Sequence, residues 1–186
     1  MEHILNFCSI ALHQGRFTWR HNSVLNHLTS TILLHKPQDL EVYADIPGSD
    51  LNGSTIPPDI LPRTSRPDLV LIRRKEKQIF VLELTCSFER NIDSANARKK
   101  EKYTQLKSDI EDQGYTCYLV PFEIGSRGYI SKRNKLDLTT VFHATNLKFN
   151  TAKCMKDLSK IALLSSFSIF HAYTQPTWQD PPLLKP

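Results

Sequence analysis

Two short apolar runs near the middle of the chain constrain its fold more than any other feature. Leu69 to Ile72 and Ile79 to Leu84 are separated by the polar stretch from Arg73 to Gln78. Their length and apolar content predict two strands, and the polar stretch predicts the turn of a hairpin. Because an apolar strand pair has to pack against another element, the hairpin predicts a layered domain with a β-sheet.

The rest of the chain alternates between helical and strand-like patterns. The predicted elements are an amphipathic helix from Trp19 to Leu34 with Val24, Leu25, Leu28 and Ile32 on its apolar stripe, a strand from Leu40 to Ile46, a long loop from Pro47 to Pro67, a helix from Asn91 to Gln113 that Asn91 caps and Gly114 ends, a strand from Tyr115 to Ile124, a turn at Gly125 to Gly128, and a helix from Ser159 to Tyr173. This order predicts an α/β (α+β) fold with helices on a mixed central sheet.

Composition is typical of one compact domain, and its net charge permits binding to a polyanion without requiring it. The 186 residues are 40% hydrophobic and 23% charged, with a formal net charge of +5. Basic residues cluster at Arg73, Arg74, Lys75 and Lys77, at Arg98, Lys99, Lys100 and Lys102, and at Arg127, Lys132, Arg133 and Lys135. Each cluster alone is typical of a solvated face, but three in one small chain favour nucleic acid as a partner.

The cellular setting is predicted from what the sequence lacks. No apolar stretch approaches the length of about 20 residues that crosses a bilayer, and no secretory signal begins the chain. The four cysteines form no Cys-x-x-Cys pair, which favours reduced thiols in an intracellular protein without a membrane partner.

Two acids accompany the predicted hairpin. Asp68 directly follows Pro67 and opens one strand, and Glu83 lies near the end of the next. If the turn centres near Lys75, both acids lie at the same end of strands about 4.8 Å apart, so both carboxylates could reach one divalent cation. The alternative is that Glu83, in an apolar run, only pairs with an arginine.

Lys99 interrupts the apolar stripe of the following helix. At about 100° per residue, position 99 lies on the face that carries Ile92, Ala95, Leu106 and Ile110, and Tyr103 lies one turn further along. A lysine there either reaches outward to water or stands beside the two acids. In the second case it would orient the attacking water or stabilise phosphate charge.

These residues belong to a larger set of motifs. The motifs are Arg66–Leu71 (RPDLVL), Glu83–Thr85 (ELT) and Arg98–Tyr103 (RKKEKY), with Gly15–Leu25 (GRFTWRHNSVL) and Tyr43–Asp45 (YAD) upstream and Glu123–Gly128 (EIGSRG) downstream. Together they resemble the restriction-like endonuclease domain of non-LTR retrotransposons, which belongs to the PD-(D/E)xK nucleases. The resemblance implies a mixed sheet flanked by helices, in which Asp68 and Glu83 bind Mg²⁺ or Mn²⁺ for phosphodiester hydrolysis.

The resemblance also implies roles for other residues. The motif lysine two residues after the second acid is Thr85 here, so the helix is expected to supply it as Lys99, with Lys102 as second choice. Asp45 is expected as a third metal ligand, although an Asp at a strand end is often a turn residue. His21 is expected to cap or pack rather than to catalyse. The expected DNA contacts are Arg73, Arg74, Lys100, Tyr103, Arg127, Lys132 and Arg133.

His3 and Cys8 have the spacing of the second half of a zinc knuckle. The Cys-x₂-Cys half is missing, so no zinc is expected. The predicted organisation is a knuckle remnant over 1–14, a nuclease core over 15–150, and a C-terminal helix with an irregular tail packed on that core over 151–186.

The predicted function is a DNA endonuclease whose nick primes reverse transcription, with a reverse transcriptase domain of the same polyprotein as partner and a nuclear location if the chain is part of a retrotransposon. Three alternatives stay open. The chain could be a degenerate module that only binds nucleic acid, a nuclease of the same fold acting on branched DNA, or a structural remnant whose acids face solvent.

Overall fold

The computed structural model describes residues 1–47, 53–62 and 64–184, apart from the side chains of Asp93 and Ala95. The elements are η1 (His3–Phe7, a π-helical turn), α1 (Ser9–His13), α2 (Arg16–His35), β1 (Glu41–Ala44), β2 (Leu69–Arg73), β3 (Gln78–Ser87), η2 (Glu89–Asn91, a 3-10 turn), α3 (Ile92–Asp112), β4 (Thr116–Gly125), α4 (Lys132–Ala144) and α5 (Thr151–His171). No described helix is long and apolar enough to cross a membrane.

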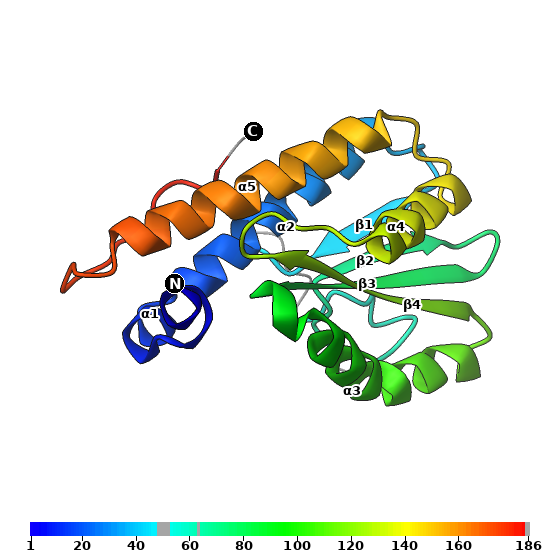
Figure 1. Ribbon diagram of the computed structural model, residues 1–186. Helices are drawn as coiled ribbons and strands as arrows, with labels where there is room; N and C mark the ends of the chain where they lie inside the picture. Colours follow the sequence, from blue (N-terminus) through cyan, green and yellow to red (C-terminus); the bar gives the residue numbers. More distant parts are fainter. Residues whose placement is uncertain (48–52, 63, 185–186) are drawn as a thin grey trace.

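The four strands form one mixed sheet in the order β1-β2-β3-β4. β1, β2 and β3 are antiparallel neighbours, and β4 runs parallel to β3. A parallel neighbour needs a crossover connection, and α3 supplies it between β3 and β4. Helices α2 and α5 run side by side on one side of the sheet, and α3 lies on the other (Figure 1). The predicted fold class, a mixed sheet flanked by helices, is confirmed.

Each face of the sheet carries its own apolar core. The core on the side of α2, α4 and α5 contains Leu25, Leu28, Leu82, Leu84, Phe122, Leu138, Phe142, Leu158 and Ile161. The core on the side of α3 contains Val70, Ile72, Ile79, Val81, Tyr103, Leu106 and Ile110, together with Ile56, Ile60 and Leu61 from the connection before β2. Alternate residues of β2 and β3 therefore point to opposite cores, as the strand period requires.

The central elements agree with the sequence predictions, with small shifts of their ends. The predicted hairpin is β2 and β3, and β3 extends three residues further than expected, to Ser87. Residues 48–52 and 63 of the predicted loop, and the side chain of Ala95 on the predicted stripe, lie outside the described part of the chain. Asn91 occupies the N-cap position of α3, but its side chain makes no capping hydrogen bond, so that detail of the prediction was wrong.

The helices at the two ends of the chain differ more. α5 begins at Thr151, eight residues before the predicted start, because Asn150 caps it by accepting a hydrogen bond from the Lys153 N–H. α4 had no predicted counterpart of its own. The N-terminal segment forms η1 and α1 and is held to the core by Arg20, whose guanidinium donates to the Leu5 and Cys86 carbonyls at 3.0 and 2.8 Å.

Candidate functional site

Asp68 and Glu83 converge at one end of the central hairpin. Leu69 pairs with Leu82, so Asp68 lies opposite Glu83, and its N–H donates to Glu83 Oε1 at 3.2 Å. The Asp68 side chain turns along β3, where Oδ2 accepts from the Leu84 N–H at 2.7 Å. The Glu83 side chain is 1% exposed and that of Asp68 is 14% exposed. The arrangement is a half-open carboxylate pair, with Asp68 on its solvent side.

Lys99 brings its ammonium group to both acids. Its Nζ lies 2.6 Å from Glu83 Oε2 and 3.8 Å from Asp68 Oδ2, and the side chain is 21% exposed. The position follows from the helical stripe, because α3 packs its inner face on β3 and β4. The partner of Glu83 in this structure is therefore a lysine, not an arginine, and Lys99 turns toward the acids instead of reaching outward to water.

His21 is a fourth member of this cluster, and sequence reasoning missed it. Its Nε2 lies 3.2 Å from Asp68 Oδ2. The expectation of a capping role was wrong, because α2 begins at Arg16 with Gly15 at its N-cap and His21 lies in the second turn. A signal was available: position 21 continues the stripe of Leu25, Leu28 and Ile32 by four residues, so a histidine on the buried face needs a polar partner.

The four side chains shift one another's protonation. Burial raises the pKa of Asp68, but the hydrogen bond and charge of His21, with the charge of Lys99, outweigh burial and leave that pKa lowered. Burial and the charge of Asp68 raise the pKa of Glu83, which Lys99 only partly offsets. Burial lowers the pKa of His21, but the contact with Asp68 outweighs it and the net shift is upward. Of the two acids, Asp68 is thus the one more readily ionised.

Tyr103 forms the floor of the site. It is 7% exposed and packs in the core on the α3 side of the sheet. Burial, with a hydrogen bond to Glu83, raises the pKa of its hydroxyl. Lys102, the second choice for the catalytic lysine, donates from its Nζ to the Tyr103 hydroxyl at 2.8 Å, and no ion pair is described between it and either acid. The ring leaves little surface for the expected DNA contact of Tyr103, which stays a prediction. Of the two lysines, it is Lys99 that reaches both carboxylates.

Asp45 lies beside the acids, but its carboxylate has another partner. Its N–H donates to the Asp68 carbonyl at 2.9 Å, which brings the end of β1 to the site. Its side chain is held by Arg66, whose Nε donates to Oδ1 at 3.1 Å. In the described parts of the chain, no three His, Cys, Asp or Glu side chains gather closely enough to hold a metal ion. The geometry thus does not support Asp45 as a third ligand.

The residues present fit a divalent cation as a partial ligand set. Asp68 and Glu83 supply carboxylate oxygens, the donors that Mg²⁺ and Mn²⁺ prefer, and water fills the remaining positions in such sites. Thr85, on the same side of β3 as Glu83, has a buried Oγ1 with no hydrogen-bond partner. Lys99 Nζ contacts both carboxylates, which would be the ligands of such a cation.

The basic residues at the hairpin turn lie far from the acids. Arg73 is five residues along β2 from Asp68, about 16 Å at about 3.3 Å per residue. Its guanidinium donates to the Ala144 carbonyl and to Glu76, and Arg74 pairs with Glu41 and Asp59. These contacts tie the turn to its surroundings. Arg73 is 15% exposed and Arg74 37% exposed, so DNA binding by these two residues stays a prediction.

Of the other expected DNA contacts, two are paired with acids and two are exposed without a described ion pair. Arg127 pairs with Glu89 and lies over the Phe88 ring, and Arg133 pairs with the buried carboxylate of Glu123 at 3.2 Å. Both guanidinium groups remain about half exposed. Lys100 and Lys132 are exposed, so they remain accessible to a polyanion.

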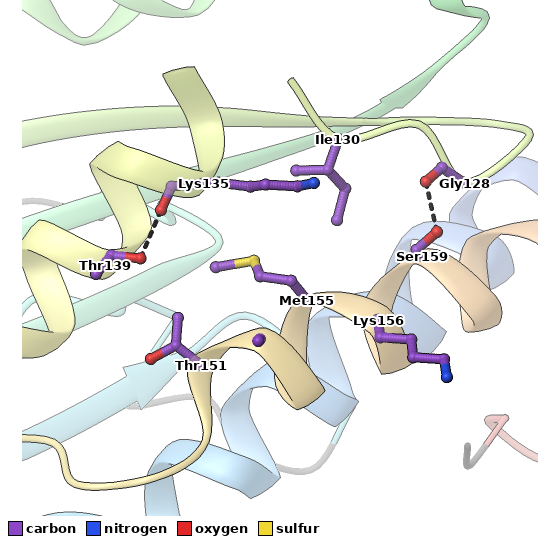
Figure 2. Close-up of a pocket in the computed structure, with 9 residues that line it drawn as sticks. Gly128, Ile130, Lys135, Thr139, Thr151, Met155, Lys156 and Ser159 are labelled. Atoms are coloured by element: carbon purple, nitrogen blue, oxygen red, sulfur yellow. Dashed lines mark hydrogen bonds between the residues drawn. The ribbon is translucent and has the colours of Figure 1, made fainter. Parts of the chain in front are cut away.

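A cavity of about 490 Å³ lies away from the acids, between α4, α5 and the turn before α4. Lys135 and Met155 extend into it from the two helices, and Ser159 Oγ donates to the Gly128 carbonyl at its edge (Figure 2). None of His21, Asp68, Glu83 and Lys99 lines this cavity, so the cavity is separate from the acid site.

Cys8, which with His3 was expected to be the second half of a zinc knuckle, is buried with a free thiol.

No protein-family model and no curated protein matches this sequence. Among solved structures, the chain is similar to an N-terminal domain of a reptarenavirus L protein, with 16% sequence identity and a TM-score of 0.38. The alignment covers 76% of this chain and 73% of that chain. Similarity at this level does not indicate the function of this chain. The chemistry is indicated by the cluster of His21, Asp68, Glu83 and Lys99.

Proposed function

We propose that this chain is a metal-dependent DNA endonuclease that hydrolyses a phosphodiester bond. The observation that carries the proposal is the convergence of Asp68 and Glu83 on one ammonium group, Lys99 Nζ, at a partly open end of the sheet. A pair of carboxylates with a lysine beside them is the arrangement expected for cation-assisted hydrolysis of a phosphate ester.

Asp68 and Glu83 would hold Mg²⁺ or Mn²⁺, which when bound polarises a phosphoryl oxygen and lowers the pKa of water. The side chains have separate tasks. Asp68, with its lowered pKa, is an ionised ligand at neutral pH. Lys99 favours the ionised form of Glu83 and is the group placed to orient a water molecule or stabilise phosphate charge. His21 holds Asp68 through Oδ2.

The resemblance to the endonuclease domain of non-LTR retrotransposons suggests the biological setting of this proposal. In that setting the nick supplies a 3′-hydroxyl that primes reverse transcription, and a reverse transcriptase domain of the same polyprotein acts on it. The reaction would then take place in the nucleus.

One observation favours a second candidate, a module that binds nucleic acid without cleaving it. Lys99 and His21 already place two basic side chains beside the carboxylates. If Lys99 stays paired with Glu83 and no cation binds the carboxylates, the site does not catalyse hydrolysis, and the chain only binds nucleic acid.

Plasmid nicking separates the two candidates. Supercoiled plasmid is incubated with wild type, Asp68→Asn and Glu83→Gln in Mg²⁺, in Mn²⁺ and in EDTA. Asp112→Asn and Glu111→Gln, exposed acids at the end of α3, are the matched controls. We expect cation-dependent nicking by wild type and controls and none by the two site variants. Equal nicking by Asp68→Asn would refute the assignment, and DNA binding without nicking by wild type would favour the second candidate. A four-way junction in parallel tests for branched substrates.

A further inference from the structure

A groove of about 470 Å³ crosses the outer edge of the sheet between α3 and α4. Its lining includes Asn96 and Lys100 from α3, Tyr118 and Pro121 from β4, and Asp137 and Thr140 from α4. None of these residues contacts the carboxylate pair through a hydrogen bond or ion pair described above. The groove is therefore a separate surface from the cation site.

The groove is nevertheless adjacent to that site. Pro121 pairs with Glu83 across the β3–β4 ladder, and neighbouring strands lie about 4.8 Å apart. On α3, Lys99 and Tyr103 form the row that faces the acids, and Asn96 and Lys100 form the next row, one position round the helix. The groove therefore lies on the other side of α3 from the acids, beyond β4.

Tyr118 gives the groove an aromatic surface. It is 42% exposed, and its ring stacks on the buried ring of Phe80, with centroids 4.8 Å apart and an angle of 12° between the planes. The strand backbone and Phe80 hold the ring in place from behind. A fixed, exposed aromatic ring beside a lysine is the combination on which single-stranded nucleic acids bind, with a base on the ring and a phosphate on the cation.

We propose that this groove binds a single-stranded segment of nucleic acid, with a base stacked on Tyr118 and a backbone phosphate near Lys100. The proposal rests on the proposed function, because it gives a nucleic-acid substrate a second contact surface on the other side of α3 from the acids. Asp137 is the acid in the groove and opposes binding.

A peptide strand added to the β4 edge is the rival occupant, and the backbone disfavours it. Pro121 has no N–H to donate. The Glu123 carbonyl already accepts from Asn134 Nδ2 at 2.7 Å, and the Gly125 N–H already donates to the Tyr129 carbonyl at 2.7 Å. Three backbone groups that strand addition would use on this edge, at Pro121, Glu123 and Gly125, are therefore missing or already paired.

The test measures binding of a fluorescein-labelled oligothymidine of about 12 nucleotides by anisotropy, in EDTA, so that cleavage plays no part. We expect Tyr118→Ala to weaken binding by about fivefold or more, the lower end of a base–aromatic stack, and Tyr118→Phe to bind within about twofold of wild type. Lys100→Met should weaken binding, and Asp137→Asn should strengthen it. Tyr173→Ala and Lys156→Met, exposed residues outside the groove, are the matched controls.

Photo-crosslinking identifies the contact directly. An oligonucleotide with 5-bromodeoxyuridine should crosslink to Tyr118, as mapped by mass spectrometry of the peptide. A duplex of the same length keeps its bases stacked internally, so Tyr118→Ala should change its affinity less than twofold.

Several results would overturn the inference. They are unchanged single-strand affinity in Tyr118→Ala, a crosslink elsewhere with none at Tyr118, or binding of an acidic peptide that excludes the oligonucleotide. Because binding is measured without a cation, a loss of nicking in the site variants tests the proposed function separately. Groove binding without nicking leaves this inference standing and refutes the nuclease.

Discussion

Removal of the ammonium group of Lys99 should destabilise the protein in a way that depends on pH. In Lys99→Met, two carboxylates remain at the end of the hairpin, and the nearly inaccessible Glu83 loses the donor at 2.6 Å from Oε2. Removing one partner of a buried ion pair costs about 3–5 kcal/mol, and because Lys99 is 21% exposed and Asp68 keeps its contact with His21, we expect about 2–3 kcal/mol near neutral pH.

The pH dependence follows from the raised pKa of Glu83. An acid whose pKa is raised by folding contributes stability below its unfolded pKa, and that stability is lost as the pH rises through the folded pKa. Without Lys99 the folded pKa of Glu83 rises further, so the loss continues to higher pH. Asp68, with a lowered pKa, stays ionised throughout this range. The difference in stability between wild type and variant should therefore widen from about pH 5.5 to about pH 8.

Urea unfolding at the two pH values measures both effects. Lys102→Met is the matched control, because it removes a lysine from the same helix whose contact is the Tyr103 hydroxyl and not a carboxylate. We expect the control to change the free energy of unfolding by less than about 1 kcal/mol, with no dependence on pH. An equal loss in the two variants, or a Lys99→Met loss that is the same at both pH values, would refute the charge argument.

Three other predictions concern single residues. The imidazole of His21 should titrate above its ordinary pKa in an NMR titration, because the contact with Asp68 outweighs burial, and Asp68→Asn should lower that pKa; an unchanged value would contradict the contact. Gly128→Ala should cost about 2 kcal/mol or more in thermal or urea unfolding, because φ is +86° and a Cβ would lie 2.7 Å from the Ser159 carbonyl oxygen; wild-type stability would contradict that packing. Burial raises the thiol pKa of Cys86, Cys117 and Cys154 to about 12, so a thiol reagent such as DTNB should label these three only on unfolding, and rapid labelling of the native protein would show that they are accessible.

The sheet and the acid pair followed from local patterns in the sequence. Strand period and a short polar turn are local properties, and they fix the register that places Asp68 opposite Glu83. The helical period did the same for Lys99. The same period applies to His21, which lies four residues before Leu25 on the buried face of α2 and is not its cap.

Other features depend on contacts between distant segments. α4 has a buried face of Asn134, Leu138, Val141 and Phe142, too short an apolar stripe to stand out, and the Ser131 cap supplies its start. The sequence clusters of basic residues that include Arg73, Arg74, Arg127 and Arg133 predict a surface that binds a polyanion. In the fold each meets an acid from another segment or from a nearby turn, which charge counts along a chain cannot show.

The most direct test of the account is a titration with Mn²⁺ followed by calorimetry on wild type, Asp68→Asn, Glu83→Gln and the control Asp112→Asn. The account predicts saturable cation binding by wild type and the control, and loss of that binding in both site variants. Equal Mn²⁺ affinity in wild type and Asp68→Asn would show that the two carboxylates do not hold a cation. The proposed metal-dependent hydrolysis would then have no metal site.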